Sequence, residues 1–360
     1  MTARLRTRRA FLGVAGAVVG GSLLAGAAAW SQVERLLGSG GDADPDAPIA
    51  RGPYLTRVDG RSADLRWVAA PERVVKVVAT GPDGSAVAAD GGRLRGLAPG
   101  TRYTWRAAVD GEDAGSGAFT TAPDALDGGF SFAVIGDYGD GGPHQRAVGQ
   151  RIVEQDPRFV VTAGDNSYLV AAASLLDRNI FQPFGELLRR TPLVLCMGDH
   201  DEFWPGPDAL LAAFGQERRQ VVRYGPVQLV ICGDRVTDAA GLAFVRDALA
   251  EPGPALRFVV QHRPMQPGNP LAAVARAGGA NAVFVGHLHR YERRVVDGML
   301  QFTVGSSGKG PGSLEATPRS PDALVSLLDY GHLRVDLRPG GAIAYRFVDE
   351  TGRVLDEHVA

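Results

Sequence analysis

The chain has 360 residues, of which 45% are hydrophobic and 22% are charged, so it has enough apolar material for a large core and is not expected to be disordered. Its formal net charge of −2 offers no basic surface for nucleic acid, and beyond the first thirty residues no stretch is long and apolar enough to span a bilayer. These limits favour small molecules as partners.

The N-terminus is predicted to be an export signal. Four arginines, at positions 4, 6, 8 and 9, precede an uncharged Gly/Ala-rich run over 11–29, which ends in three alanines. The string from Thr7 to Leu12 resembles a twin-arginine signal, which implies export to the periplasm, the cell surface or the medium. Loss of residues 1–29 would change the formal charge from −2 to −6, because four Arg and no acid are removed. An uncleaved anchor is the alternative, and only then would the membrane be a partner.

Residues 30–47 are predicted to be a flexible polar linker, and residues 48–123 a small all-β sandwich. The linker is rich in Gly and Asp and has no periodicity. In the following segment, alternating runs at 63–68, 74–79 and 102–109 are separated by turn residues, which is typical of a sandwich. The phrase from Leu97 to Tyr103 resembles fibronectin type III domains. No catalytic constellation occurs in this segment.

From residue 124 to residue 360 the pattern changes to that of an α/β domain. Apolar runs of about five residues alternate with helical stretches, and most of the runs end in Gly followed by Asp or His. The runs are 132–137, 160–165, 193–199, 229–234 and 282–287, and a sixth, 258–262, lacks the glycine. Because ligands in such sheets collect at the carboxyl ends of strands, we expect the polar residues to meet at one rim.

The residues at these strand ends suit metal ions. They include three carboxylates and three imidazoles, which first-row metals prefer: Asp137, Asp165, Asp199, His262, His287 and His289. One catalytic ion needs about three protein ligands, so six indicate two ions that share a carboxylate. Such a pair makes hydroxide near neutral pH and neutralises a phosphoryl group.

Five blocks from Pro48 to the C-terminus resemble the purple acid phosphatase branch of the calcineurin-like metallophosphoesterases. The blocks occur in the family's order and are Gly136–Gly139, Gly164–Tyr168, Gly198–Asp201, Val259–His262 and Gly286–His289. The resemblance implies two mixed sheets with helices outside, a four-layer α/β/β/α sandwich. It also implies hydrolysis of phosphomonoesters, with small phosphate esters as partners and metal-activated hydroxide as the nucleophile.

The branch is selected by Gly139, which stands where most metallophosphoesterases have a histidine, and by Tyr168. By the resemblance, a ferric ion would be held by Asp137, Asp165, Tyr168 and His289. A divalent ion, Fe, Zn or Mn, would be held by Asp165, Asp199, His262 and His287. Asp199 departs from the family, which has Asn there, and we expect the extra charge to tighten the divalent ion and to weaken attraction for phosphate.

His200 is the candidate general acid by its motif position, with Asp201 beside it to hold the imidazolium. Asn166 and Arg263 are candidate phosphate contacts, the arginine through bidentate bonds. Asp234 is interpreted as a turn residue, and His144 and Lys309 as loop residues without a role.

Two alternatives to phosphomonoester hydrolysis stay open. One is hydrolysis of phosphodiesters or nucleotides by the same site, and the other is an exported binding protein whose metal site is vestigial. Cys196 and Cys232 each lie inside an apolar run and are predicted to be buried free thiols, with a disulfide as the alternative if export occurs and their strands are neighbours.

Overall fold

The computed structural model describes residues 49–310 and 318–360. The predicted signal (1–29) and linker (30–47) lie outside the described residues. None of the helices within the described ranges combines the length and the apolar character that crossing a bilayer requires.

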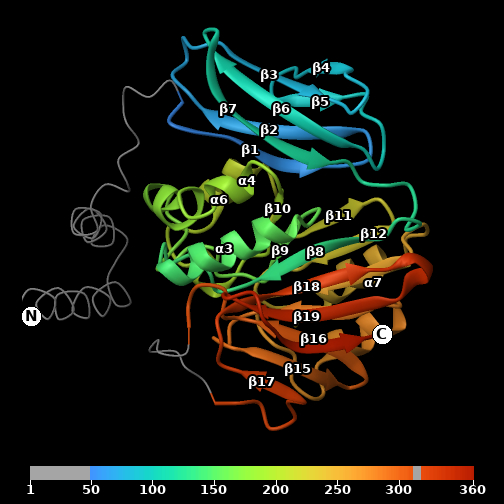
Figure 1. The fold of residues 1–360 in the computed structure, drawn as a ribbon. Coiled ribbons are helices and arrows are strands. Elements are labelled where there is room, and N and C mark those ends of the chain that lie inside the picture. The colour runs from blue at the N-terminus through green and yellow to red at the C-terminus, as the bar shows by residue number, and fades with distance from the viewer. Residues whose placement is uncertain (1–48, 311–317) are drawn as a thin grey trace, which may run out of the picture. The chain divides into compact units, whose positions relative to one another are not determined.

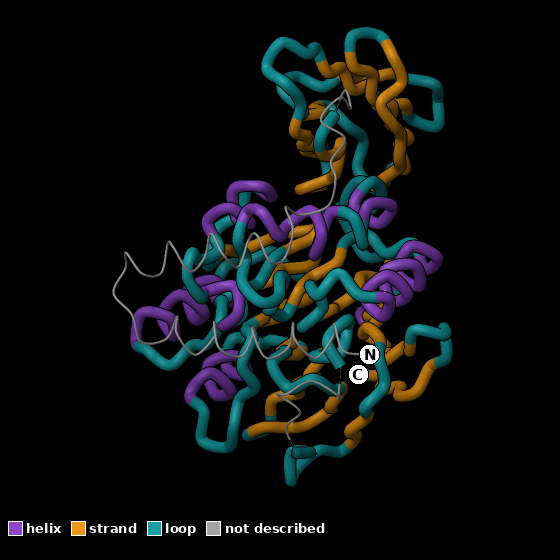
Figure 2. The backbone as a smooth tube through the Cα atoms, turned by 90° about the vertical axis from the view of Figure 1, so that its left-hand side faces the viewer, coloured by secondary structure: helices purple, strands orange, loops and turns teal. Residues whose placement is uncertain are grey.

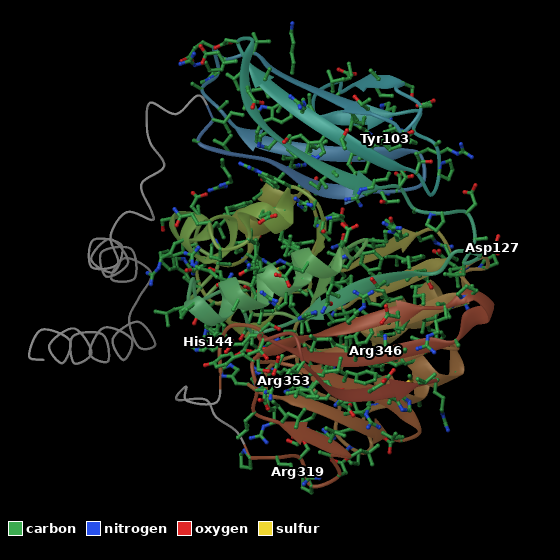
Figure 3. The ribbon with its side chains drawn as sticks, viewed as in Figure 1. Tyr103, Asp127, His144, Arg319, Arg346 and Arg353 are labelled. Atoms are coloured by element: carbon green, nitrogen blue, oxygen red, sulfur yellow. The ribbon has the colours of Figure 1, made fainter. Side chains whose placement is uncertain are left out.

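The N-terminal region is all-β, as predicted. One sheet has the order β1 (Arg51–Val58), β2 (Ser62–Val68), β5 (Arg93–Arg95), and the other has the order β4 (Ala86–Ala88), β3 (Val75–Thr80), β6 (Arg102–Val109), β7 (Glu112–Thr120). Strand β6 alternates exposed and buried residues, so Tyr103, which is labelled in Figure 3, and Trp105 enter the core. The N–H of Ala98 donates to the hydroxyl of Tyr103 at 2.9 Å, which ties the preceding turn to the start of β6.

The remainder of the chain contains two larger mixed sheets (Figure 1). The six-stranded sheet has the order β10 (Leu193–Val194), β9 (Val160–Thr162), β8 (Phe130–Ile135), β18 (Gly331–Leu337), β19 (Ile343–Asp349), β20 (Val354–Val359). The seven-stranded sheet has the order β11 (Gln220–Tyr224), β12 (Val227–Ile231), β13 (Leu256–Val260), β14 (Ala282–Val285), β16 (Met299–Val304), β15 (Tyr291–Val296), β17 (Val325–Leu327).

Helices cover the outer face of each of these sheets, and Figure 2 shows them outside the strands. The helical segments are α3 (Pro143–Gln155), η1 (Ala173–Leu175), η2 (Asp177–Phe181), α4 (Gly185–Leu188), α5 (Asp199–Glu202), α6 (Asp208–Phe214), α7 (Ala239–Ala250), α8 (Pro270–Ala277) and η3 (Pro339–Gly341). Helix α3 contacts β18 of the six-stranded sheet, whereas α7 contacts β12 and α8 contacts β16 of the seven-stranded sheet.

Alternation of side chains along the strands explains the four layers. In β8, Phe132 and Val134 point into the core between the two sheets, while Ala133 and Ile135 point toward the helices. The ring of Phe132 lies 5.3 Å from that of Phe258 in the facing sheet. Because both faces of the central strands are covered, their residues must be apolar throughout, which is the pattern that predicted them. The predicted α/β/β/α sandwich is confirmed.

All six predicted strands exist, but they are divided between the two sheets. Strands β8, β9 and β10 run parallel in one sheet, and β12, β13 and β14 run parallel in the other. Packing the sheets face to face therefore brings two sets of strand ends together rather than one. Cys196 and Cys232 are buried free thiols, as predicted.

Candidate metal centre

The candidate ligands lie in short loops directly after strands, and the backbone is bent sharply at three of them. Asp137, Asp165 and His287 have φ values of 53°, 52° and 69°. This left-handed region is uncommon for residues other than glycine, although Asp and His tolerate it better than most. Such strain at neighbouring loop residues marks a functional site, because packing must hold each residue in place against its preference.

The predicted ferric ligands form one compact set around the hydroxyl of Tyr168. The Tyr168 hydroxyl lies 3.1 Å from Asp137 Oδ1, 2.9 Å from Asp165 Oδ2 and 3.2 Å from His289 Nε2. All four side chains are buried. A phenol, two carboxylates and an imidazole whose donor atoms meet at one point are an oxygen-rich set that suits a hard cation.

The predicted divalent ligands form a second set around one oxygen of Asp199. Asp199 Oδ1 lies 2.9 Å from His262 Nε2 and 3.1 Å from His287 Nδ1. One donor atom from each of these three residues lies within 4.8 Å of the others. His262 is held by a contact of 2.8 Å between its Nδ1 and the carbonyl oxygen of Ala163, which leaves Nε2 directed at the set.

Asp165 connects the two sets, as the family resemblance implied for a bridging ligand. Its Oδ2 faces Tyr168 at 2.9 Å, and its Oδ1 lies 3.4 Å from His262 Nε2. Asp137, Asp165 and His262 also satisfy the distances for a shared cation site. The donor chemistry and the divided orientation of Asp165 therefore fit two cations better than one.

The electrostatics of the cluster also favour cations. Burial acts to lower the pKa of His262, but Asp165, Asp199 and Asp137 outweigh it and raise that pKa to about 10. Burial acts to raise the pKa of Asp199, yet hydrogen bonds from His262 and His287 hold it well below its usual range. In the absence of metal, a proton on His262 thus supplies the positive charge that the carboxylates require.

His200 lies at the edge of this cluster. Its backbone N–H donates to Asp165 Oδ1 at 3.0 Å, and its ring is centred 4.6 Å from that of Tyr168. Its Nδ1 lies 3.0 Å from the carbonyl oxygen of Leu169, which can only accept, so this nitrogen carries a proton. Nε2 is then the atom that could deliver a proton to a leaving group.

Asp201 and Asn166 differ from their predicted roles, because both are fully buried behind the ligands. Asp201 accepts from the backbone N–H groups of Gly198, Asn166 and Ser167 and from the Asn166 amide, so its oxygens are committed to bracing the loops. Asn166 donates to Cys196 O and Asp201 and accepts from Tyr138, which leaves no group for phosphate. The sequence held a signal for Asp201, since an acid three residues after a helix N-cap typically closes a capping box.

Arg263 is also engaged with protein groups. Its Nε lies 3.1 Å from Asp234 Oδ1, its Nη2 lies 3.1 Å from Asp199 Oδ2, and its Nη1 lies 3.0 Å from His287 Nε2. The guanidinium is therefore paired with two carboxylates of the protein, Asp234 through Nε and Asp199 through Nη2. Asp234, interpreted from the sequence as a turn residue, supplies one of these carboxylates, and no sequence signal distinguished it from other strand-end aspartates.

Two loop residues to which the sequence assigned no role take different positions. The ammonium of Lys309 lies 4.9 Å from the centroid of the Tyr168 ring, beside the first ligand set. His144, which is labelled in Figure 3, stacks on Tyr330 with ring centroids 3.7 Å apart, and its Nδ1 lies 2.7 Å from Glu350 Oε2. A cavity of about 500 Å³ adjoins His287 and Arg263 and is lined mainly by polar residues. The open space next to the ligands can receive a small substrate.

Comparisons with known proteins agree with this fold. Residues 130–291 match the family model of calcineurin-like phosphoesterases. A purple acid phosphatase from yellow lupin (Lupinus luteus) seeds is 15% identical, with 86% of this chain and 74% of that chain covered and a TM-score of 0.69. PhoD is 12% identical, with 84% and 91% covered and a TM-score of 0.58. GAP50, the anchor in the inner membrane complex of Plasmodium, is 16% identical, with 64% and 88% covered and a TM-score of 0.52. No curated protein matches this chain. At these identities the structural likenesses concern the fold alone.

Proposed function

We propose, from the premise that residues 130–291 form a calcineurin-like phosphoesterase domain, that this protein is an exported two-metal phosphatase acting on phosphomonoesters. The family implies hydrolysis of phosphoesters, and the choice of monoesters, the acid phosphatase type and the twin-arginine export are our own extension. Export is supported by the sequence of residues 4–29, and the branch by Tyr168 in the place of an imidazole.

The observation that carries the proposal is the division of Asp165 between two donor sets. Oδ2 faces the oxygen-rich set of Tyr168, and Oδ1 faces the set that contains His262. Because the two sets differ in their donor atoms, they would select different ions, and the phenolate of the first set favours a trivalent ion. We propose iron(III) for the first set and a divalent iron, zinc or manganese for the second. Two bound ions would supply a hydroxide nucleophile and neutralise the charge of the phosphoryl group.

The remaining steps belong to side chains of the protein. His200, held through Nδ1 by the carbonyl oxygen of Leu169, donates the proton of Nε2 to the departing alkoxide oxygen. Lys309 places a cation beside the first set, where a phosphoryl oxygen can accept from its ammonium. The polar cavity next to His287 receives the organic part of the ester.

Metal content and colour together test the proposal. We expect purified protein to contain two metal ions per chain, one of them iron, and to show the visible absorption of a ferric tyrosinate. The Tyr168→Phe variant should keep its metals and lose most of the colour. A colourless protein that holds a single zinc ion would contradict the proposal.

Parallel assays separate the substrate classes. A phenyl phosphomonoester should be hydrolysed much faster than the diester of the same phenol, whereas the reverse preference would favour the phosphodiesterase alternative. Replacing both His262 and His287 with Ala should abolish hydrolysis. Full biological activity of that double variant would instead favour a binding protein with a vestigial site.

A further inference from the structure

The most informative departure of this chain from the purple acid phosphatase pattern is Asp199, and the structure shows what accompanies it. The two oxygens of the Asp199 carboxylate face opposite ways. Oδ1 meets His262 Nε2 at 2.9 Å and His287 Nδ1 at 3.1 Å, inside the second ligand set, whereas Oδ2 meets Arg263 Nη2 at 3.1 Å. One oxygen is therefore available to a cation, and the other is committed to an ion pair.

An asparagine could not fill this position beside Arg263. If its carbonyl oxygen kept the place of Oδ1, its NH₂ group would stand 3.1 Å from the Arg263 guanidinium, and both groups are donors only. If the amide were reversed, its nitrogen would face the ligand set, and an amide nitrogen is not a metal ligand. Asp199 and Arg263 thus fit each other, and either one alone is mismatched.

Arg263 is in turn fixed from its other side by Asp234. The guanidinium Nε lies 3.1 Å and 3.2 Å from the two oxygens of Asp234, and the backbone N–H of Arg263 donates to the backbone carbonyl of Asp234 at 2.9 Å. Only 26% of the Arg263 side chain is exposed. A phosphate would have to displace two carboxylates to be bound by this guanidinium, which argues against a substrate contact.

We infer that Asp234, Arg263 and Asp199 act as one unit in which Arg263 is a positioning residue: it holds Oδ2 of Asp199, so that Oδ1 faces the set that would bind the divalent ion. The inference rests on the two-metal site of the proposed function. It revises the expectation that Asp199 simply adds a negative charge to the site, because the second oxygen of the carboxylate is paired with a cation.

A double-mutant cycle on divalent-metal affinity tests the unit. The dissociation constant for zinc would be measured by competition with a chelator for the natural protein, Asp199→Asn, Arg263→Met and the combined variant. Each single substitution should weaken zinc binding by about tenfold or more, as expected when a group that orients a metal ligand is lost. The combined variant should bind no more weakly than Asp199→Asn alone, since removal of Arg263 also removes the clash between two donors.

Three more variants separate the geometry of the Arg263 guanidinium from its charge and from general effects of losing an ion pair. Arg263→Lys keeps the charge but cannot reach both carboxylates, so it should weaken zinc binding as Arg263→Met does. Asp234→Asn should act in the same direction with a smaller loss. Arg223→Met, which breaks the exposed ion pair of Arg223 with Glu251, is the matched control and should leave the zinc affinity unchanged.

The outcomes distinguish this inference from the proposed function. If the losses of zinc affinity from Asp199→Asn and Arg263→Met multiplied in the combined variant, the two residues would not be coupled, although the two-metal site could still exist. An Arg263→Met variant with unchanged zinc affinity and a raised KM would also overturn the coupling, because Arg263 would then be a phosphate contact. A natural protein that binds no divalent ion would overturn the proposed function and this inference together.

Discussion

His332 is a buried imidazole that should make the stability of the protein depend on pH. It is fully buried in β18, its Nε2 lies 2.9 Å from Gln155 Oε1, and burial followed by the charge of Arg334 lowers its pKa from 6.5 to about 3. The unfolded chain therefore binds the proton more readily, so His332 costs nothing above pH 6.5 and destabilises the fold as the pH falls toward 3. At pH 5 the loss should be about 2 kcal/mol.

Urea unfolding at pH 7.5 and pH 5 measures this loss directly. In the His332→Gln variant, whose amide can still donate to Gln155, the decrease in unfolding free energy between the two pH values should be smaller than in the natural protein by about the same 2 kcal/mol. An equal decrease in both proteins would show that His332 is protonated without cost in the folded state.

The contribution of His200 to kcat should be largest for esters whose leaving group must be protonated as it departs. The His200→Gln variant should lose about 10²-fold or more in kcat with an alkyl phosphate, and far less with a nitrophenyl phosphate, whose phenolate departs unprotonated. Its metal content should stay the same, since His200 is not among the candidate ligands. Equal losses with both esters would contradict a general acid and indicate a binding role.

Lys309 should act on substrate binding rather than on the chemical step. Removing its ammonium in Lys309→Met should raise KM for a phosphomonoester by about tenfold, the effect of one lost charge-assisted hydrogen bond, with little change in kcat. Lys76→Met, on the exposed side of β3 in the N-terminal sandwich, is the control and should leave both constants unchanged. A fall in kcat alone would place Lys309 in another role.

Residue types and order predicted which side chains would gather, but not the directions in which they point. The blocks around Asp137 and His287 could be read because a strand, a glycine and a ligand follow one another. Arg263 and Asn166 were predicted to contact phosphate, whereas the structure bonds them to partners such as Asp234 and Asp201, which lie 29 and 35 residues away in the sequence. Which polar groups remain available to a substrate depends on long-range pairing that one sequence does not display.

At the scale of elements, the loops after β8 and β9 are packed so closely that Gly139 allows no side chain. A Cβ built at Gly139 would lie 1.8 Å from the carbonyl oxygen of Asn166, and the N–H of Tyr168 donates to the carbonyl of Gly139 at 2.7 Å. The position at which the family resemblance implies a histidine in most metallophosphoesterases is thus closed by the loop that brings Tyr168 to the first set. The glycine at position 139 and the tyrosine at position 168 therefore have one structural cause, the close packing of these two loops.

Gly139→Ala should therefore push these two loops apart. We expect a loss of about 1–3 kcal/mol in unfolding free energy, typical of overpacking, together with loss of most of the tyrosinate colour, because Tyr168 would move with its loop. Gly185→Ala, at the first position of α4 with open space around its Cβ, is the matched control and should be neutral or slightly stabilising. An unchanged colour in Gly139→Ala would show that the loops are not interlocked.

The elements themselves were predicted more completely than their grouping. Both faces of β8 and β13 are covered, so their continuous apolar runs were readable from the sequence. Which strands share a sheet was not readable from periodicity, because β18 to β20 return from the C-terminus to pair beside β8. That antiparallel pairing spans about two hundred residues, and no local pattern encodes it.

At the scale of the whole described chain, the N-terminal sandwich is joined to the C-terminal α/β domain by specific contacts. Arg51 of β1 makes a bidentate ion pair with Asp177 at 2.6 and 2.7 Å and lies over the ring of Phe181. The indole of Trp105 donates to the carbonyl of Arg189, and Tyr54 packs within the core beneath α6. We expect the two regions to unfold together, since each completes the other's buried surface.

Arg51→Ala should lower the unfolding free energy by about 1–2 kcal/mol, because it removes a bidentate ion pair and a cation–π contact that are both largely shielded from water. Calorimetry should still show one transition, at a lower temperature. Arg73→Ala, which breaks an exposed ion pair with Asp110 inside the sandwich, should have no measurable effect. Two separate transitions in the natural protein would contradict this expectation, because the sandwich would then unfold independently of the α/β domain.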